Sequence, residues 1–125
     1  MSKTVYSSML IDELLKRFES ACLEQYETYI TDDLAKFKRN FQIQVKIRNE
    51  LKARGPEARR SLLRLLSHDN HQVRLQAAKV VYPVARPEAT RCLQALAAAQ
   101  FPDDQCFDAR MTLHRLEEVP DCLDH

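Results

Sequence analysis

The sequence predicts an all-α fold, a short α-solenoid of about six antiparallel helices in three hairpins. Its 125 residues include one glycine, and Leu, Ala, Arg, Glu and Gln, all good helix formers, predominate. Apolar residues recur at helical spacing in six separate segments. Residues 56–66 (PEARRSLLRLL) and 87–97 (PEATRCLQALA) agree at six of eleven positions with an offset of 31. Such an internal repeat is typical of helix pairs that stack to bury their apolar faces.

The first helix is expected over residues 5–28, where an apolar arc opposes an acidic stripe. The arc contains Met9, Leu10, Leu14, Leu15, Phe18, Cys22 and Tyr26. The dipeptide Asp32-Asp33 provides an N-cap for a second helix over residues 33–54. Gly55 and Pro56 then predict the end of that helix and the start of the next.

The second helix has an apolar arc that spans about 200° of its circumference. The arc comprises Leu34, Phe37, Phe41, Val45, Ile47 and Leu51, with Ile43 at its edge. We interpret this helix as central and covered from two sides. An apolar patch that awaits a partner is the alternative.

Four further helices are expected over residues 56–68, 71–85, 87–99 and 104–118. Asp69 or Asn70 would be the N-cap of the helix over 71–85, and FPDD would interrupt the chain before the helix over 104–118. The short connections predict antiparallel neighbours, and the offset aligns Ala78 with Ala109. We expect one domain over 1–125. It would comprise an N-terminal pair (1–55), a first repeat (56–85), a degenerate second repeat (87–118) and an acidic tail (119–125).

Charge is distributed unevenly along the chain. Residues 36–64 contain ten basic and two acidic side chains, a net charge of +8, whereas residues 1–35 carry −4 and residues 65–125 carry −3. This asymmetry can steer a charged partner. The alternative is that the basic and acidic segments pack together and neutralise one another.

The sequence lacks the signatures of an enzyme. One glycine cannot build a phosphate-binding loop, and neither GxSxG nor HExxH occurs. The strongest metal candidate is His68-Asp69-Asn70-His71 with distant Cys122 and His125, but its histidines flank a helix break, which favours a solvated turn. Cys92 has no histidine at useful spacing. We therefore expect no catalytic residue, metal or cofactor.

Other features predict a cytoplasmic protein with reduced thiols. The N-terminus has no secretory signal, and no run of eighteen apolar residues is present. The four cysteines, Cys22, Cys92, Cys106 and Cys122, have no CxxC spacing.

Residues 62–78 (LLRLLSHDNHQVRLQAA) resemble a HEAT repeat. The matching positions are Leu62, Leu65 and Leu66 in the first helix, Asp69 in the turn, the Val73-Arg74 pair, and Ala77 and Ala78. The resemblance implies a structural role for Asp69 and Arg74, a turn carboxylate that caps the next helix and meets an arginine. The second unit has Asp104 and Ala109 but no valine-arginine pair, which makes it a degenerate repeat or a terminal cap.

The combination of NELKARG and SLLRLLSHDNHQVRLQAA is similar to a small bacterial family of single-domain HEAT-like proteins of unassigned biochemistry. HEAT-like modules recur among immunity proteins of bacterial toxin systems. The resemblance therefore implies a protein partner, a cognate toxin.

A protein-binding surface is expected on the second helices of the pairs. In residues 71–85 the core stripe is Val73, Ala77, Val80 and Val84, which leaves Gln72, Gln76 and Lys79 outward. Leu75 and Tyr82 lie on the side of the helix opposite this core stripe. They are either anchors of an interface or residues that a neighbouring helix buries. Lys38, Arg39, Lys46 and Arg110 would form the rim. The C-terminal segment, with Glu117 and Glu118, is a solvated tail or an acidic docking strip.

The leading hypothesis is an immunity protein that binds and neutralises a cognate toxin. A general HEAT-like scaffold or adaptor is the alternative. The sequence argues against nucleic acid, because Phe37 and Phe41 fall on the apolar arc and the isoelectric point is near 7.7. It also argues against a membrane role, since the apolar arc of the second helix is needed for packing within the fold. The oligomeric state is left open.

Overall fold

The computed structural model describes residues 5–125, and every regular element in that range is a helix. This confirms the all-α fold class. None of these helices is long and apolar enough to cross a bilayer. The chain divides into two compact units, residues 1–61 and 62–125. The single domain and the solenoid arrangement therefore stay predictions.

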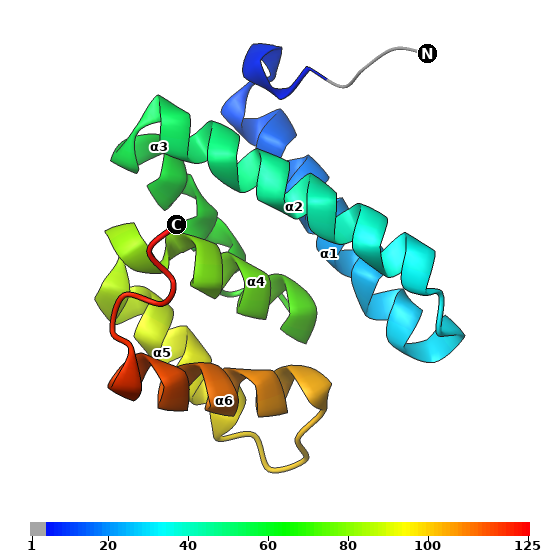
Figure 1. Cartoon of the computed structure of the whole chain (residues 1–125), viewed down its shortest axis with the longest axis vertical. Helices are drawn as coiled ribbons and strands as arrows, with labels where there is room; N and C mark the ends of the chain where they lie inside the picture. The colour runs from blue at the N-terminus through cyan, green and yellow to red at the C-terminus, as the bar shows by residue number, and fades with distance from the viewer. Residues whose placement is uncertain (1–4) are drawn as a thin grey trace. The chain divides into compact units, whose positions relative to one another are not determined.

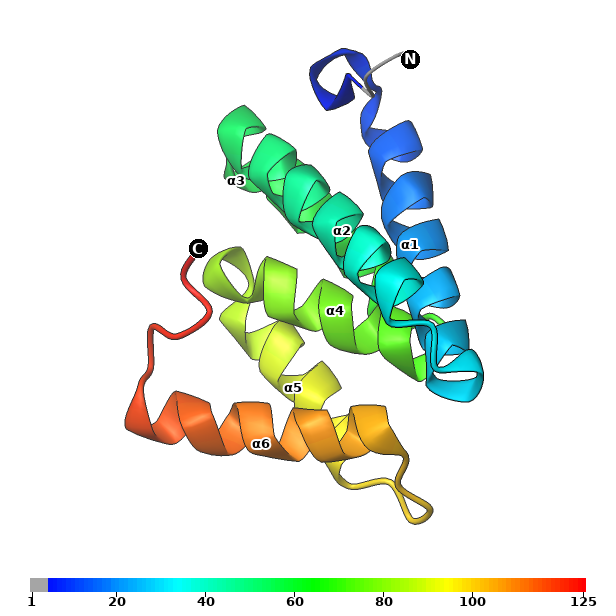
Figure 2. The ribbon, with the colours of Figure 1, turned by 45° about the vertical axis from the view of Figure 1, so that its right-hand side comes forward.

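The first unit is dominated by two long helices, α1 (Ile11–Thr31) and α2 (Leu34–Arg54), which lie side by side in both views (Figures 1 and 2). The Asp33 side chain accepts a hydrogen bond from the Lys36 N–H at 3.0 Å, so the predicted N-cap of α2 is confirmed. Gly55 follows α2 with a φ of 110°, a conformation that favours glycine. Pro56 then begins the short helix α3 (Pro56–Arg60), as expected.

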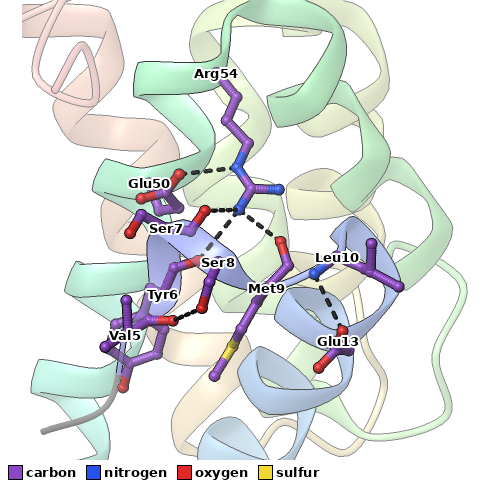
Figure 3. Close-up of polar contacts among 9 residues, drawn as sticks. All are labelled: Val5, Tyr6, Ser7, Ser8, Met9, Leu10, Glu13, Glu50 and Arg54. Atoms are coloured by element: carbon purple, nitrogen blue, oxygen red, sulfur yellow. Dashed lines mark hydrogen bonds and ion pairs between the residues drawn. The ribbon is translucent and has the colours of Figure 1, made fainter.

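The first helix begins later than residue 5, the predicted start. Residues Tyr6–Ser8 form a 3₁₀ turn, and Arg54 fixes this segment. One terminal nitrogen of Arg54 donates to the carbonyl oxygens of Tyr6 (3.1 Å), Ser7 (3.3 Å) and Met9 (2.6 Å), while Glu50 holds its Nε at 2.8 Å (Figure 3). These contacts keep the segment outside the helix.

The interface between α1 and α2 contains polar residues. Gln44 donates to Gln25 at 2.8 Å, and both side chains are buried. The buried residues of α2 are Asn40, Gln44, Ile47 and Leu51, which form a single stripe at helical spacing. The predicted apolar arc is covered only in part, because Leu34 and Phe41 are exposed while Phe37, Ile43 and Val45 are half-buried.

The second unit contains α4 (His71–Val81), α5 (Arg86–Ala97) and α6 (Asp104–Glu118), and α5 packs against both other helices. Asn70 caps α4 by accepting from the N–H groups of Gln72 (2.9 Å) and Val73 (3.2 Å). The predicted helices over 56–68 and 71–85 are shorter, because each ends in a 3₁₀ segment, Ser61–Leu65 and Tyr82–Val84. Pro83 contributes to the second break because it has no N–H to continue the ladder.

Helix α4 is buried around most of its circumference. Its buried residues are Gln72, Val73, Leu75, Ala77, Ala78 and Val81. At 100° per residue these positions surround the axis. Val80 and Val84 of the expected core stripe are only half-buried.

The C-terminal segment folds back on the second unit. The guanidinium of Arg86 lies 3.1 Å from Asp124 Oδ2 and 5.2 Å from the ring centre of Tyr82. The segment is therefore tethered and is not a free solvated tail.

Candidate protein-binding surface

The turn between α1 and α2 exposes a group of large apolar side chains. Tyr29, Leu34 and Phe37 line a shallow hollow there, with Asp32 and Asp33 at the turn itself. The rings of Tyr29 and Phe37 meet edge to face, with their centres 6.0 Å apart.

Two more apolar residues extend this surface along the helices. Ile30 on α1 is 83% exposed, and Phe41, one turn beyond Phe37 on α2, is 46% exposed. Leu34 is 63% exposed and Tyr29 48%. We call Tyr29, Ile30, Leu34, Phe37 and Phe41 the α1–α2 patch. A group of exposed apolar residues of this kind marks an interaction surface more often than isolated ones do.

Local structure explains why these side chains face outward. Asp32 ends α1 in a left-handed conformation (φ 58°), which short polar residues tolerate better than most, and Asp33 caps α2. The interface between the helices is then occupied by Gln25, Gln44 and Asn40. Because these polar residues hold the buried stripe of α2, Leu34 and Phe41 are left on its solvent side.

The same helix carries an excess of positive charge. Its residues include seven basic side chains, Lys36, Lys38, Arg39, Lys46, Arg48, Lys52 and Arg54, against Glu50 alone, a net charge of +6. Lys36 lies 3.8 Å from Glu27, and Arg54 binds Glu50. Lys38, Arg39, Lys46 and Lys52 are exposed and form no ion pair among the contacts of residues 5–125. Neutralisation by packing, one of the sequence-based alternatives, therefore does not apply to these four cations.

Three of the predicted contact residues lie on α2. At 100° per residue Lys38 is on the same side of this helix as Leu34 and Phe41, whereas Arg39 and Lys46 are on the opposite side. Lys46 lies beside the N-terminal segment. Lys38 therefore places positive charge next to exposed apolar side chains.

Three other predicted contact residues are buried. Gln72 and Leu75 are each 1% exposed and Tyr82 is 9% exposed, so the prediction that Gln72 faces outward is wrong, and for Leu75 and Tyr82 the alternative of burial holds. The reason is the near-complete burial of α4, which leaves no free face opposite the expected core stripe. Gln76 is half-buried.

The remaining predicted residues make contacts within the second unit. Lys79 binds Asp108 at 2.7 Å, and Arg110 Nε donates to the Ala97 carbonyl at 2.7 Å, at the C-terminal end of α5. Glu117 and Glu118 are exposed, and Glu118 lies 3.7 Å from His114. The predicted surface is therefore not assembled on this unit.

The structural pair expected from the HEAT resemblance is also not formed. Asn70, and not Asp69, caps α4, and Asp69 is exposed. Arg74 Nε is buried and has no hydrogen-bond partner. Within residues 5–125 there is no Asp69–Arg74 ion pair, because Asn70 takes the capping position next to the helix.

Helix α6 exposes a second, smaller apolar pair. Phe107 is 61% exposed and Met111 is 53% exposed, and both border an open groove that also contains Lys79 and Asp108. With two apolar residues instead of five, this surface provides a matched control for the α1–α2 patch.

The cysteines favour packing over nucleophilic chemistry. All four are free thiols, and Cys22, Cys92 and Cys106 are buried, as their apolar context predicted. Burial raises the pKa of Cys22 and of Cys92 above the ordinary thiol value. Both thiols therefore stay protonated near neutral pH and are poor nucleophiles.

One group of side chains in the second unit has the composition of a metal site. Ligand atoms of His71, Asp103 and Cys106 all lie within 4.8 Å of one another. The sequence predicted no site here. His71 was grouped instead with the residues of its local turn and with distant Cys122 and His125, and in that turn the His68 Nδ1 accepts from the Asn70 N–H at 3.0 Å.

Fold and surface together define a small all-helical protein that exposes apolar residues beside a basic helix. The chain belongs to a family described as a domain of unknown function (DUF2019), whose model matches residues 12–117. It is also similar to the crystal structure of the protein RPA1889 from Rhodopseudomonas palustris CGA009. That similarity has a TM-score of 0.87 and 34% sequence identity, and it covers 93% of this chain and 95% of the other. No curated protein sequence matches the chain.

Proposed function

We propose that this chain is a protein-binding module and that it uses the α1–α2 patch as its contact surface. The observation that carries the proposal is the exposure of Ile30, Leu34 and Phe41, the last two on the same side of α2 as unpaired Lys38. Aromatic and aliphatic anchors within a charged rim are the usual composition of a protein interface. The partner would present an apolar pocket within an acidic surface.

The construction of the first unit suits this role. Asp33 fixes the start of α2, and Gln44 fixes its separation from α1 through Gln25. A surface held in place before binding loses less conformational entropy on association. The basic rim would speed encounter with an acidic partner, and the apolar residues would slow its release.

The partner class comes from the HEAT-like resemblance. We propose that the partner is a cognate bacterial toxin that the chain binds and neutralises; a general scaffold or adaptor would use the same surface without inhibition. The proposal includes the short solenoid of helix pairs. Its support is that Ala78 and Ala109, which the repeat makes equivalent, are both fully buried.

A second candidate is single-stranded nucleic acid. The exposure of Phe41 removes one ground on which the sequence argued against it, because this ring is accessible on the same side of α2 as Lys38. Bases stack on exposed aromatic rings, and phosphates bind to neighbouring cations. Binding of this kind weakens steeply with added salt.

The direct test is co-expression with the product of the adjacent gene, because an immunity gene is expected to lie next to its toxin gene. We expect the chain to co-purify with that product and to restore the growth of cells that the product inhibits. The variant Leu34→Ala/Phe41→Ala should lose both effects, while Phe107→Ala/Met111→Ala on α6 should keep both. Co-purification without growth rescue would favour the adaptor. Loss on nuclease treatment would favour nucleic acid, and an effect of the α6 variant alone would refute the surface assignment.

A further inference from the structure

The group formed by His71, Asp103 and Cys106 joins the starts of two helices in the second unit. His71 is the first residue of α4, Asp103 caps α6, and Cys106 lies in the first turn of α6. The two carboxylate oxygens of Asp103 have different partners. Oδ1 accepts from the Cys106 N–H at 2.9 Å, and Oδ2 lies 2.6 Å from His71 Nδ1. The cap therefore orients the second oxygen toward the imidazole.

The thiol of Cys106 faces the same imidazole nitrogen. Its sulfur lies 3.8 Å from His71 Nδ1, so carboxylate, thiol and imidazole converge on one point. Cys106 is fully buried, while the side chains of His71 and Asp103 are 32% and 34% exposed. Two of the three side chains are therefore partly accessible to solvent.

This geometry does not fit a cysteine-histidine-aspartate nucleophilic triad. In a triad the carboxylate binds one imidazole nitrogen and the nucleophile gives its proton to the other. Here Asp103 and Cys106 both approach Nδ1. Burial also raises the pKa of the Cys106 thiol, the opposite of what an activated nucleophile needs.

Convergence on one point is what a metal ion requires. Zinc bonds of about 2.0–2.3 Å to nitrogen, oxygen and sulfur place tetrahedral ligand atoms about 3.3–3.6 Å apart. The distance between Cys106 Sγ and His71 Nδ1 is 3.8 Å, close to this range. His71 Nδ1 and Asp103 Oδ2 are 2.6 Å apart and would have to separate. The hydrogen bond between them would then be replaced by one bond from each atom to the metal. Imidazole, carboxylate and thiolate together suit Zn²⁺.

We propose that His71 Nδ1, Asp103 Oδ2 and Cys106 Sγ bind one Zn²⁺ ion, with water in the fourth position. Binding forms three protein–metal bonds and releases the thiol proton of Cys106 to solvent. A neutral His71 ring transfers its Nδ1 proton to Nε2 through solvent, and a charged ring releases it. The carboxylate and thiolate then balance the charge of the ion. The ion would join the N-terminal ends of α4 and α6.

The test begins with the full chain freed of metal by a chelator and titrated with Zn²⁺ in a calorimeter. We expect one ion per chain. Titration with Co²⁺ should produce a thiolate-to-metal charge-transfer absorption that is absent from Cys106→Ser. His71→Gln and Cys106→Ser should weaken binding roughly tenfold or more, since even residues that only orient ligands contribute this much.

Substitution of the buried Cys106 can itself unfold the protein, so Asp103→Asn provides a second test. Asparagine is as good an N-cap as aspartate, so this variant should keep its helix and its melting temperature and still lose zinc affinity. Cys122→Ser and His114→Gln, a thiol and an imidazole outside the group, should bind as the unmodified chain does. Absence of Zn²⁺ binding, or equal binding by the folded Asp103→Asn variant, would overturn the proposal.

Discussion

At the scale of single residues, Arg54 fixes the N-terminal segment. Its side chain joins three carbonyl oxygens of residues 6–9 to the C-terminal end of α2 (Figure 3). An arginine suits this position because its planar group directs several N–H bonds at once, which a lysine cannot do in the same geometry.

Replacement of Arg54 should release this segment. We expect Arg54→Ala to lower the free energy of unfolding by about 1 kcal/mol, because the contacts are partly exposed. Protease cleavage within residues 5–10 should become faster, and Arg54→Lys should behave much like the alanine variant. Lys52→Ala, which removes an exposed cation on the same helix that does not contact this segment, is the control. Unchanged cleavage in both Arg54 variants would show that the segment is held by other contacts.

Residues that act over short distances along the chain were predictable from sequence. Asp33, Gly55 and Asp103 lie at the predicted helix boundaries, because capping depends on neighbours within a few positions. The His71–Asp103 contact was not predicted, since it joins residues 32 positions apart. Periodicity and local spacing contain no information about such a pair.

At the scale of elements, the polar pairing of α1 with α2 determines which face of α2 is exposed. The prediction favoured burial of the whole apolar arc of this helix and kept an exposed apolar patch as the alternative. In the structure Asn40 and Gln44 occupy the buried stripe with Ile47 and Leu51. The spacing of these four residues is itself helical, but only the partner Gln25, 19 positions away, makes burial of Gln44 favourable.

A double-mutant cycle tests this pairing. Gln44→Met should cost about 1–3 kcal/mol of unfolding free energy, because it removes the donor that Gln44 provides to Gln25. Gln25→Met/Gln44→Met should recover most of that loss, since both polar groups are then replaced by apolar side chains of similar shape. Chemical denaturation of the four proteins measures the coupling. Simple addition of the two single losses would contradict a coupled pair.

The same comparison explains the errors on α4. Leu75 and Tyr82 were placed opposite a core stripe, with burial by a neighbouring helix as the open alternative. The structure supports that alternative, because buried residues surround the axis of α4. A helical wheel describes one helix alone and does not reveal how many neighbours cover it.

At the scale of the whole molecule, the family match and the likeness to RPA1889 extend across both compact units. The charge asymmetry seen in the sequence persists in the structure as the unpaired cations on α2. Three residues of the α1–α2 patch, Leu34, Phe37 and Phe41, lie on the same helix, so apolar contact and positive charge are available to one partner. This coincidence underlies the proposed function.

The most direct test is the dissociation constant of the protein product of the adjacent gene, measured for three versions of the chain at low and high salt. We predict that Leu34→Ala/Phe41→Ala weakens binding by roughly thirtyfold, about 2 kcal/mol for the loss of two anchors, while Phe107→Ala/Met111→Ala does not. All three proteins should keep their helical content by circular dichroism. Added salt should weaken binding only modestly. Equal affinity of the unmodified chain and the Leu34→Ala/Phe41→Ala variant would contradict the assignment of the α1–α2 patch as the binding surface.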